Sequence, residues 1–147
     1  MDVALVLLAL AAGFGLAVQA GANATMARFA GRAEWAALVN FVVGIAALGA
    51  WLVLARLRPP SAAQLAGAPW WSWSGGLLGA FYVTAIVLLA PRLGVATTMA
   101  LAVAGQMGGA IVVDHFGLLG MAERAASPLR GLGALLLVAG VVLIRRF

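Results

Sequence analysis

Residues 3–29 read VALVLLALAAGFGLAVQAGANATMARF and contain a single charged side chain, Arg28. At a rise of about 1.5 Å per residue, a helix of this length is longer than the roughly 30 Å hydrocarbon core of a bilayer. A strand of a membrane barrel would alternate polar and apolar residues and would be about half as long. The stretch therefore predicts a helix that spans a membrane.

The rest of the chain has the same character. Of its 147 residues, 65% are hydrophobic and 9% are charged, whereas a soluble domain has about 45–50% apolar and about 25% charged residues. We predict an all-α, multi-spanning membrane protein in which residues 1–147 form a single domain of five helices. The predicted spans cover residues 3–29, 35–55, 73–90, 94–113 and 129–146. The first span carries Asp2 and no arginine ahead of it, so we expect it to be kept rather than cleaved as a signal peptide.

The residues between the spans support these boundaries. All five tryptophans lie at or near predicted helix ends, where an amphipathic ring prefers the headgroup region: Trp35, Trp51, Trp70, Trp71 and Trp73. An aromatic cage for a cation is the alternative reading of the last three. Ser127 and Pro128 are suited to the N-cap and first position of the last helix.

The arginines divide almost evenly between the two faces that five spans create. The amino-terminal face carries Arg56, Arg58, Arg124 and Arg130, and the other face carries Arg28, Arg32, Arg92, Arg145 and Arg146. Because an excess of Lys and Arg in short loops sets orientation, this split predicts insertion in both directions and an antiparallel homodimer that forms a ten-helix bundle. The alternatives are that one extra arginine decides the orientation, or that another chain fixes it.

Several polar residues fall inside the predicted spans. Gln19 and Asn23 are four residues apart and share one helix face. Asn40, Tyr82 and Gln106 lie in the second, third and fourth spans. Since exposing amides to lipid is costly, these five residues are the candidate substrate-binding groups. The alternative role for each is a hydrogen bond between helices that only holds the bundle together.

Asp114 and His115 end the fourth apolar run. A titratable pair at this depth could couple transport to a proton or a cation. The alternative, which we favour, is solvation at the interface or pairing with a nearby loop arginine such as Arg124.

Small residues point to close helix packing. Gly75 and Gly79 in the third span, and Gly105 and Gly109 in the fourth, are each four residues apart, which lets helix backbones approach one another. The pattern does not distinguish contacts within one chain from contacts between two.

Signatures of enzymes are absent from the sequence. The chain has one histidine and no cysteine, so no metal cluster is predicted, and neither a nucleophile elbow nor a phosphate-binding loop occurs. We expect no enzymatic activity and no cofactor. Nucleic acid is not an expected partner, because the arginines occur singly or in pairs rather than as a basic stripe.

The chain resembles the YdcZ-type inner-membrane exporters of the drug/metabolite transporter superfamily along essentially its whole length. The resemblance is carried by Gln19 and Asn23, FVVG at 41–44, PWW at 69–71 with the glycines that follow, Tyr82-Val83, PRLG at 91–94, AGQ at 104–106, DHFG at 114–117 and the closing helix 131–146. It implies a five-helix chain of a bacterial inner membrane that transports a small solute and works as an antiparallel pair. The pair can be a dual-topology homodimer, two separately encoded partners, or two halves of a fused ten-helix chain, and the arginine count favours the first.

Related small multidrug resistance transporters carry a buried glutamate in the first helix, where this chain offers Gln19 and Asn23. Neither amide titrates. Proton-coupled export of cations through the first helix is therefore not expected. The remaining possibilities for transport are coupling through Asp114 or His115, facilitated diffusion, or a neutral substrate. The predicted function is transport by alternating access, and the alternatives are a non-transporting scaffold or accessory subunit and a channel.

Overall fold

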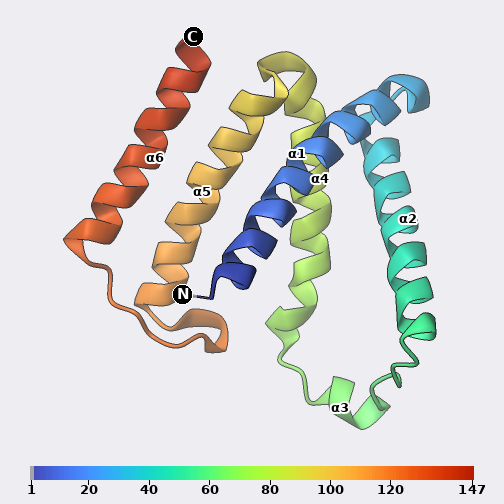
Figure 1. The fold of residues 1–147 in the computed structure, drawn as a ribbon. Coiled ribbons are helices and arrows are strands. Elements are labelled where there is room, and N and C mark those ends of the chain that lie inside the picture. Colours follow the sequence, from blue (N-terminus) through green and yellow to red (C-terminus); the bar gives the residue numbers. More distant parts are fainter. Residues whose placement is uncertain (1) are drawn as a thin grey trace. The chain divides into compact units, whose positions relative to one another are not determined.

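The computed structural model describes residues 2–147, and every regular element within them is helical (Figure 1). The long helices are α1 (Val3–Ala30), α2 (Ala33–Leu54), α4 (Ser74–Leu93), α5 (Val95–His115) and α6 (Pro128–Arg146). Short elements lie between them: α3 (Ala62–Ala66), the 3-10 turn η1 (Trp70–Trp73) and the 3-10 turn η2 (Leu118–Gly120). Five segments of the described chain are long and apolar enough to cross a membrane, with α4 extended by η1. The predicted all-helical class with five spans is confirmed.

Helix α6 shows how local sequence sets a boundary. The Ser127 hydroxyl accepts a hydrogen bond from the backbone N–H of Arg130 at 3.3 Å, and Pro128 takes the first helical position. The helix then runs through 19 residues to Arg146, which corresponds to about 28 Å and matches the hydrocarbon thickness. The predicted cap and the predicted extension of this span to the terminal arginines are confirmed.

The junction between α4 and α5 differs from the sequence expectation. Helix α4 was expected to end near Ala90, ahead of Pro91, but it includes Pro91 and continues to Leu93. The fixed φ of Pro91 suits a helix, but its missing N–H leaves out one hydrogen bond to the carbonyl four residues earlier, and the helix continues for only two residues beyond it. The chain turns at Gly94, where φ is 82° and ψ is 153°, a conformation that is essentially restricted to glycine. The Gly94 carbonyl then accepts bonds from the backbone N–H and the hydroxyl of Thr98, at 3.1 and 2.8 Å.

The chain forms two compact units. The first contains the residues up to Gly21 together with Leu89–Phe147, and the second contains Ala22–Leu88. In the first unit α5 packs along α6, and the two helices are antiparallel neighbours in Figure 1. In the second unit the last part of α1 packs with α2 and α4.

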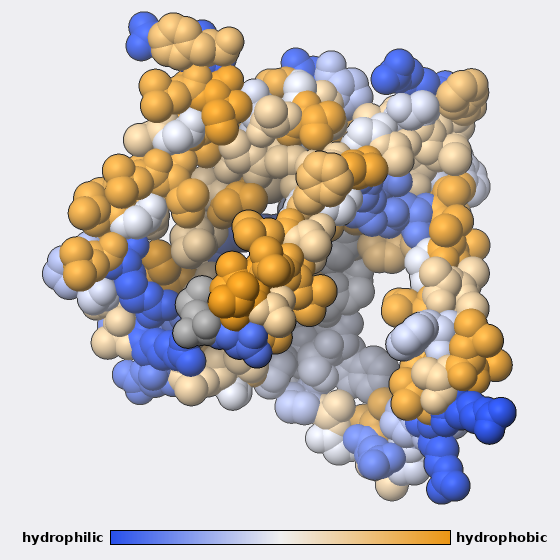
Figure 2. All heavy atoms as spheres, viewed as in Figure 1, coloured by the Kyte–Doolittle hydropathy of each residue, from blue (hydrophilic) through white to orange (hydrophobic). Residues whose placement is uncertain are grey.

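The surfaces of the long helices are strongly apolar. Side chains such as Phe14, Leu135 and Val53 are 73%, 68% and 77% exposed, and Figure 2 shows orange, hydrophobic flanks along the helices with blue, hydrophilic residues gathered mainly towards their ends. Exposed apolar area on this scale would make a protein aggregate in water. In a bilayer it is the surface that contacts lipid tails. The fold is therefore that of a multi-pass membrane protein.

Candidate functional site

The polar pair of α1 lies beside closely packed alanines. Gln19 and Asn23 are both half-buried, whereas the neighbouring Ala20 and Ala24 are only 2% and 6% exposed. Small side chains at these two positions allow another backbone to come close to α1. Gln19 already has an interaction partner within the structure. The two amides are therefore held next to protein rather than projecting freely into lipid.

The second unit has a small core between α2 and α4. It is made by Ala33, Ala36, Ala37, Val83 and Val87. Ala27, Phe41 and Tyr82 pack against this core and are themselves half-buried. Asn40, one turn after the core alanines on α2, is also half-buried and has an interaction partner. Tyr82 and Asn40, two of the predicted binding residues, thus lie at the margin of this core.

The predicted packing glycines have different surroundings. A Cβ atom placed on Gly79 would lie 3.7 Å from Cζ of Phe41, so that α2 and α4 are in contact at this point. Within residues 2–147, a Cβ atom on Gly75, Gly105 or Gly109 would meet no atom within 4 Å. The close approach is therefore made at Gly79, and the role of the other three glycines remains a prediction.

Gln106 stands apart from the other amides. It lies near the middle of α5 in the first unit and is exposed. Among the residues that the structure describes, its side chain makes no hydrogen bond. An amide at this depth is costly unless it meets another polar group or water. The five predicted binding residues are divided between the units: Gln19 and Gln106 belong to the first, and Asn23, Asn40 and Tyr82 to the second.

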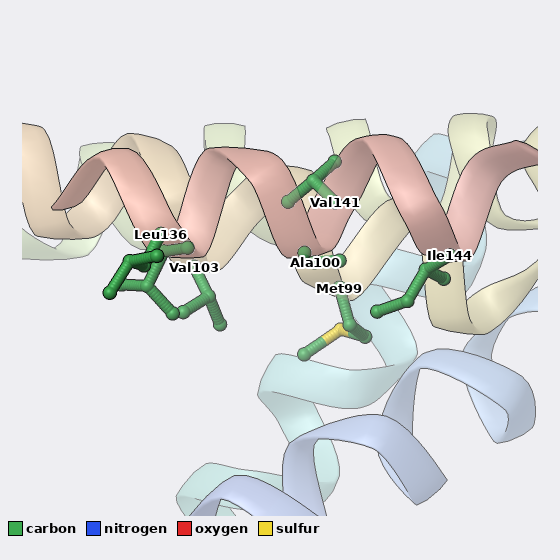
Figure 3. A pocket seen from close by; sticks show the side chains of 8 residues that line it. Met99, Ala100, Val103, Leu136, Val141 and Ile144 are labelled. Atoms are coloured by element: carbon green, nitrogen blue, oxygen red, sulfur yellow. The ribbon is translucent and has the colours of Figure 1, made fainter. Parts of the chain in front are cut away.

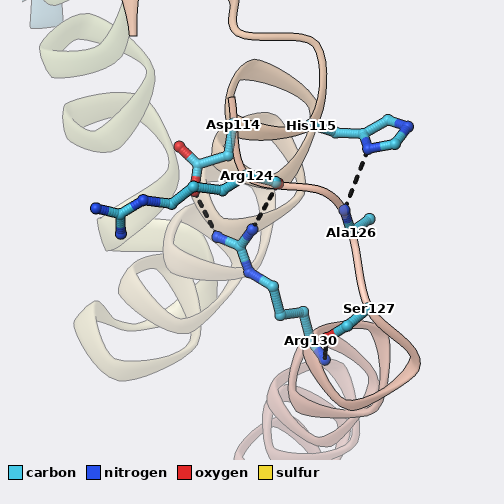
Figure 4. Close-up of polar contacts among 6 residues, drawn as sticks. All are labelled: Asp114, His115, Arg124, Ala126, Ser127 and Arg130. Carbon is cyan, nitrogen blue, oxygen red and sulfur yellow. Dashed lines mark hydrogen bonds and ion pairs between the residues drawn. The ribbon is translucent and has the colours of Figure 1, made fainter. Parts of the chain in front are cut away.

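Asp114 closes the loop between α5 and α6 (Figure 4). Its carboxylate forms an ion pair and hydrogen bond with the guanidinium of Arg130, in the first turn of α6. The other end of the same guanidinium donates to the Arg124 carbonyl at 3.0 Å, and the Arg124 backbone N–H donates to the Asp114 carbonyl at 2.7 Å. Pairing with an arginine was expected, but the partner is Arg130 rather than Arg124. No local sequence pattern indicates this choice, because Asp114 and Arg130 are 16 positions apart and the path of the loop brings them together.

His115 contributes to the same loop by a different bond. Its Nδ1 atom accepts a hydrogen bond from the Ala126 backbone N–H at 3.1 Å (Figure 4). An accepting Nδ1 requires the neutral tautomer that carries its proton on Nε2. Asp114 and His115 point in different directions, as adjacent residues on a helix do, and each ties a different part of the loop to the end of α5.

The residues described contain little that could hold a metal. No group of three or more His, Asp or Glu side chains with that capacity occurs in residues 2–147. Away from the helix ends, the polar groups of the spans are amides, hydroxyls and one phenol. They can bind a ligand by hydrogen bonds.

These features define a class of protein, a multi-pass helical membrane protein with amides inside its spans and arginines at their ends. The sequence model of the family described as "Putative inner membrane exporter, YdcZ" matches residues 4–143. The chain belongs to this family. It is 34% identical over 145 residues to the inner membrane protein YdcZ of Escherichia coli (strain K12), a match that covers 93% of this chain and 91% of that protein. No solved structure matches the chain significantly.

The comparisons confirm the resemblance seen in the sequence and place the chain in an inner membrane. Membership in an exporter family agrees with the expectation of a transport protein rather than an enzyme.

Proposed function

We propose that the chain transports a small solute across the inner membrane, and that the polar residues of its spans bind this solute by hydrogen bonds. The proposed binding residues are Gln19, Asn23, Asn40, Tyr82 and Gln106. The observation that carries the proposal is that polar side chains at the margin of the α2–α4 core, Asn40 and Tyr82, are half-buried rather than sealed within it. Membership in an exporter family supports the same conclusion.

The proposed transport cycle needs two chains. Five spans place the two termini on opposite faces of the membrane, and the arginines are split four against five between these faces. Two oppositely inserted copies would then be related by an axis in the membrane plane, the symmetry that many transporters build from inverted repeats. We propose that the antiparallel homodimer alternates access by rocking one protomer against the other.

The amides and the glycines have separate roles in this proposal. Amides and a phenol select a neutral or weakly polar solute, because they supply both donors and acceptors without a charge. The contact of Gly79 with Phe41 lets α2 and α4 stay close while they slide. Asp114 is not assigned a coupling role in this proposal, because its carboxylate is already paired with Arg130.

Transport measurements with reconstituted protein test the proposal. Proteoliposomes would be screened for saturable uptake of radiolabelled neutral solutes, amino acids, sugars and organic cations. Asn23→Leu and Gln19→Leu should then lower uptake of the transported solute at least tenfold. Each variant replaces an amide with an apolar side chain of similar size and so removes the hydrogen bonds to the solute. Thr25→Val is the matched control, since it removes a polar group from an exposed position of the same helix. Folded variants that transport at the wild-type rate would remove the proposed site.

A non-transporting scaffold or accessory subunit is the second candidate. It is favoured by one observation, that Gln19 and Asn40 both have interaction partners within the chain, as helix-joining amides would. Co-purification with one stoichiometric partner protein, and no saturable flux for any solute of the screen, would support it. Linear, non-saturating flux would instead indicate a channel.

A further inference from the structure

A groove of about 280 Å³ lies between α5 and α6 in the first unit. It is lined by Met99, Ala100, Val103, Leu136, Leu137, Gly140, Val141 and Ile144. All of these residues are apolar, and Figure 3 shows Met99, Val103, Leu136 and Ile144 projecting to the same side of the helix pair. Leu136 and Ile144 are 64% and 51% exposed. The groove therefore opens to the surroundings of the helix pair and offers no polar group to a ligand within it.

The length of the groove suits one lipid chain. From Leu136 to Ile144 the α6 wall rises by eight residues, or about 12 Å. One leaflet of a bilayer provides half of the roughly 30 Å hydrocarbon thickness, about 15 Å. The groove extends over this distance towards the carboxyl-terminal end of α6. An acyl chain of a lipid in that leaflet would lie along it with little of its length outside.

Positive charge gathers at the end of the helix pair towards which the groove extends. Ile144 is followed directly by Arg145 and Arg146, and Arg92 lies three residues before α5 begins; all three arginines are exposed. In the described part of the chain, the two ion pairs are Arg32 with Glu34 and Arg130 with Asp114, so none of these three guanidinium groups forms an ion pair there. The carboxyl-terminal end of a helix is the negative end of its dipole. The amino-terminal end of the antiparallel α5, which starts at Val95, lies at the same end of the pair and is the positive end of its own dipole. The arginines supply the full positive charges at this place.

We propose that this groove is a binding site for a phospholipid with an anionic headgroup. One acyl chain lies against Leu136 to Ile144, and the headgroup phosphate is held by Arg145 and Arg146, with Arg92 adding to the local positive charge. Basic residues at the ends of transmembrane helices bind anionic lipids in this way. The bound lipid is a fixed component of the protein rather than its transported solute. A helix of a second copy would also fill an apolar groove, but it would not require the arginines.

Native mass spectrometry of the purified chain in a neutral detergent tests the headgroup contact. The protein would be titrated with phosphatidylglycerol and, separately, with phosphatidylcholine of the same acyl chains. We expect phosphatidylglycerol to bind on the order of tenfold more tightly, and the Arg145→Gln/Arg146→Gln variant to lose this preference. The matched control is Arg56→Gln/Arg124→Gln, which removes two arginines from the opposite face and should keep the preference.

Filling the groove tests the acyl-chain contact. A Cβ atom on Gly140 meets no atom within 4 Å in the described structure, so Gly140→Leu should fold and occupy the groove, lowering the affinity for both lipids on the order of tenfold. Gly131→Leu is the control, because Gly131 lies on the opposite face of α6 and has the same free space. Circular dichroism would verify folding, and the arginine variants decide the question if Gly140→Leu does not fold.

Two results would overturn the proposal. Equal binding of the two lipids, or a preference that survives in Arg145→Gln/Arg146→Gln, would show that no anionic headgroup is bound here. Dissociation of a dimer by Gly140→Leu with unchanged lipid binding would assign the groove to a second copy of the chain. These measurements do not depend on transport, so they are independent of the proposed function.

Discussion

Among single residues, Asp114 has the most informative surroundings. Its side chain pairs with Arg130, its backbone carbonyl accepts the Arg124 N–H, and the next residue accepts the Ala126 N–H. These bonds join the end of α5 to the loop and to the first turn of α6. The side chains of Arg130 and Asp114 are 36% and 30% exposed, so the pair lies partly in solvent at the edge of the membrane. Its first role is to hold the α5–α6 hairpin, and any role in coupling remains a prediction.

Replacing the carboxylate should loosen this hairpin. Asp114→Asn keeps the size of the side chain but removes its charge, and we expect the free energy of unfolding to fall by about 1 kcal/mol or less, as is usual for partly exposed ion pairs. The N–H of Arg124 donates to the backbone carbonyl of Asp114. Once the ion pair no longer holds the loop, this hydrogen bond should open more often, and amide exchange at Arg124 should become faster. Hydrogen–deuterium exchange with mass spectrometry measures this effect.

The control for this variant is Glu123→Gln, since Glu123 is a carboxylate of the same loop without an ion pair in the described residues. Unchanged exchange throughout residues 114–130 of Asp114→Asn would show that the ion pair does not hold the loop.

At the level of elements, the contact of α2 with α4 depends on small side chains. Ala36 is fully buried, and Ala37 is 4% exposed. Alanine at these positions brings the helix backbones together, and dispersion contacts then replace the hydrophobic driving force that is absent between helices in lipid. The same closeness places Phe41 against Gly79 and Tyr82 at the margin of the core.

Enlarging one of these alanines should separate the helices. Ala36→Leu adds a branched side chain where there is no space, and we expect a loss of about 1–3 kcal/mol in stability. Thermal unfolding in detergent, followed by circular dichroism, measures it. Ala46→Leu is the control, because Ala46 is exposed on the same helix and should leave the midpoint almost unchanged. Equal midpoints for the two variants would contradict the observed packing.

For the whole molecule, we propose that the distribution of arginines leaves both orientations in the membrane open to the chain. With five spans, four arginines are assigned to the amino-terminal face and five to the other, and the proposal of dual insertion rests on this small difference under the positive-inside rule. The structure confirms the odd number of spans on which this reasoning depends.

The proposed dual insertion predicts the labelling of single cysteines. The chain has no cysteine of its own, so one can be added at either terminus and labelled from each side of intact cells. We expect both termini to react from both sides. Arg56→Gln/Arg58→Gln should shift the population towards a cytoplasmic carboxyl terminus, and Arg145→Gln/Arg146→Gln should shift it the opposite way. A single fixed orientation in the unmodified chain would exclude the antiparallel homodimer and require an oppositely inserted partner.

Part of the candidate site could be read from the sequence. An amide inside an apolar run is conspicuous, so Gln19, Asn23, Asn40 and Gln106 were identified as polar groups at membrane depth. Their surroundings could not be, because the exposure of a residue depends on which helix packs against it. Gln106 is exposed on α5 whereas the other three amides are half-buried, although all four lie within similar apolar sequence.

The sequence by itself determined the five spans, the cap of α6 and the family, because the length of an apolar run, a Ser-Pro start and a motif order are properties of neighbouring residues. Only the tertiary structure decided that Asp114 pairs with Arg130, that alanines form the α2–α4 core, and that α5 and α6 leave an apolar groove between them. These features join residues far apart in the chain. They depend on the path of a loop and on the rotation of each helix about its axis. The sequence does not specify that rotation when a helix is apolar on every side, because no single face is marked for burial.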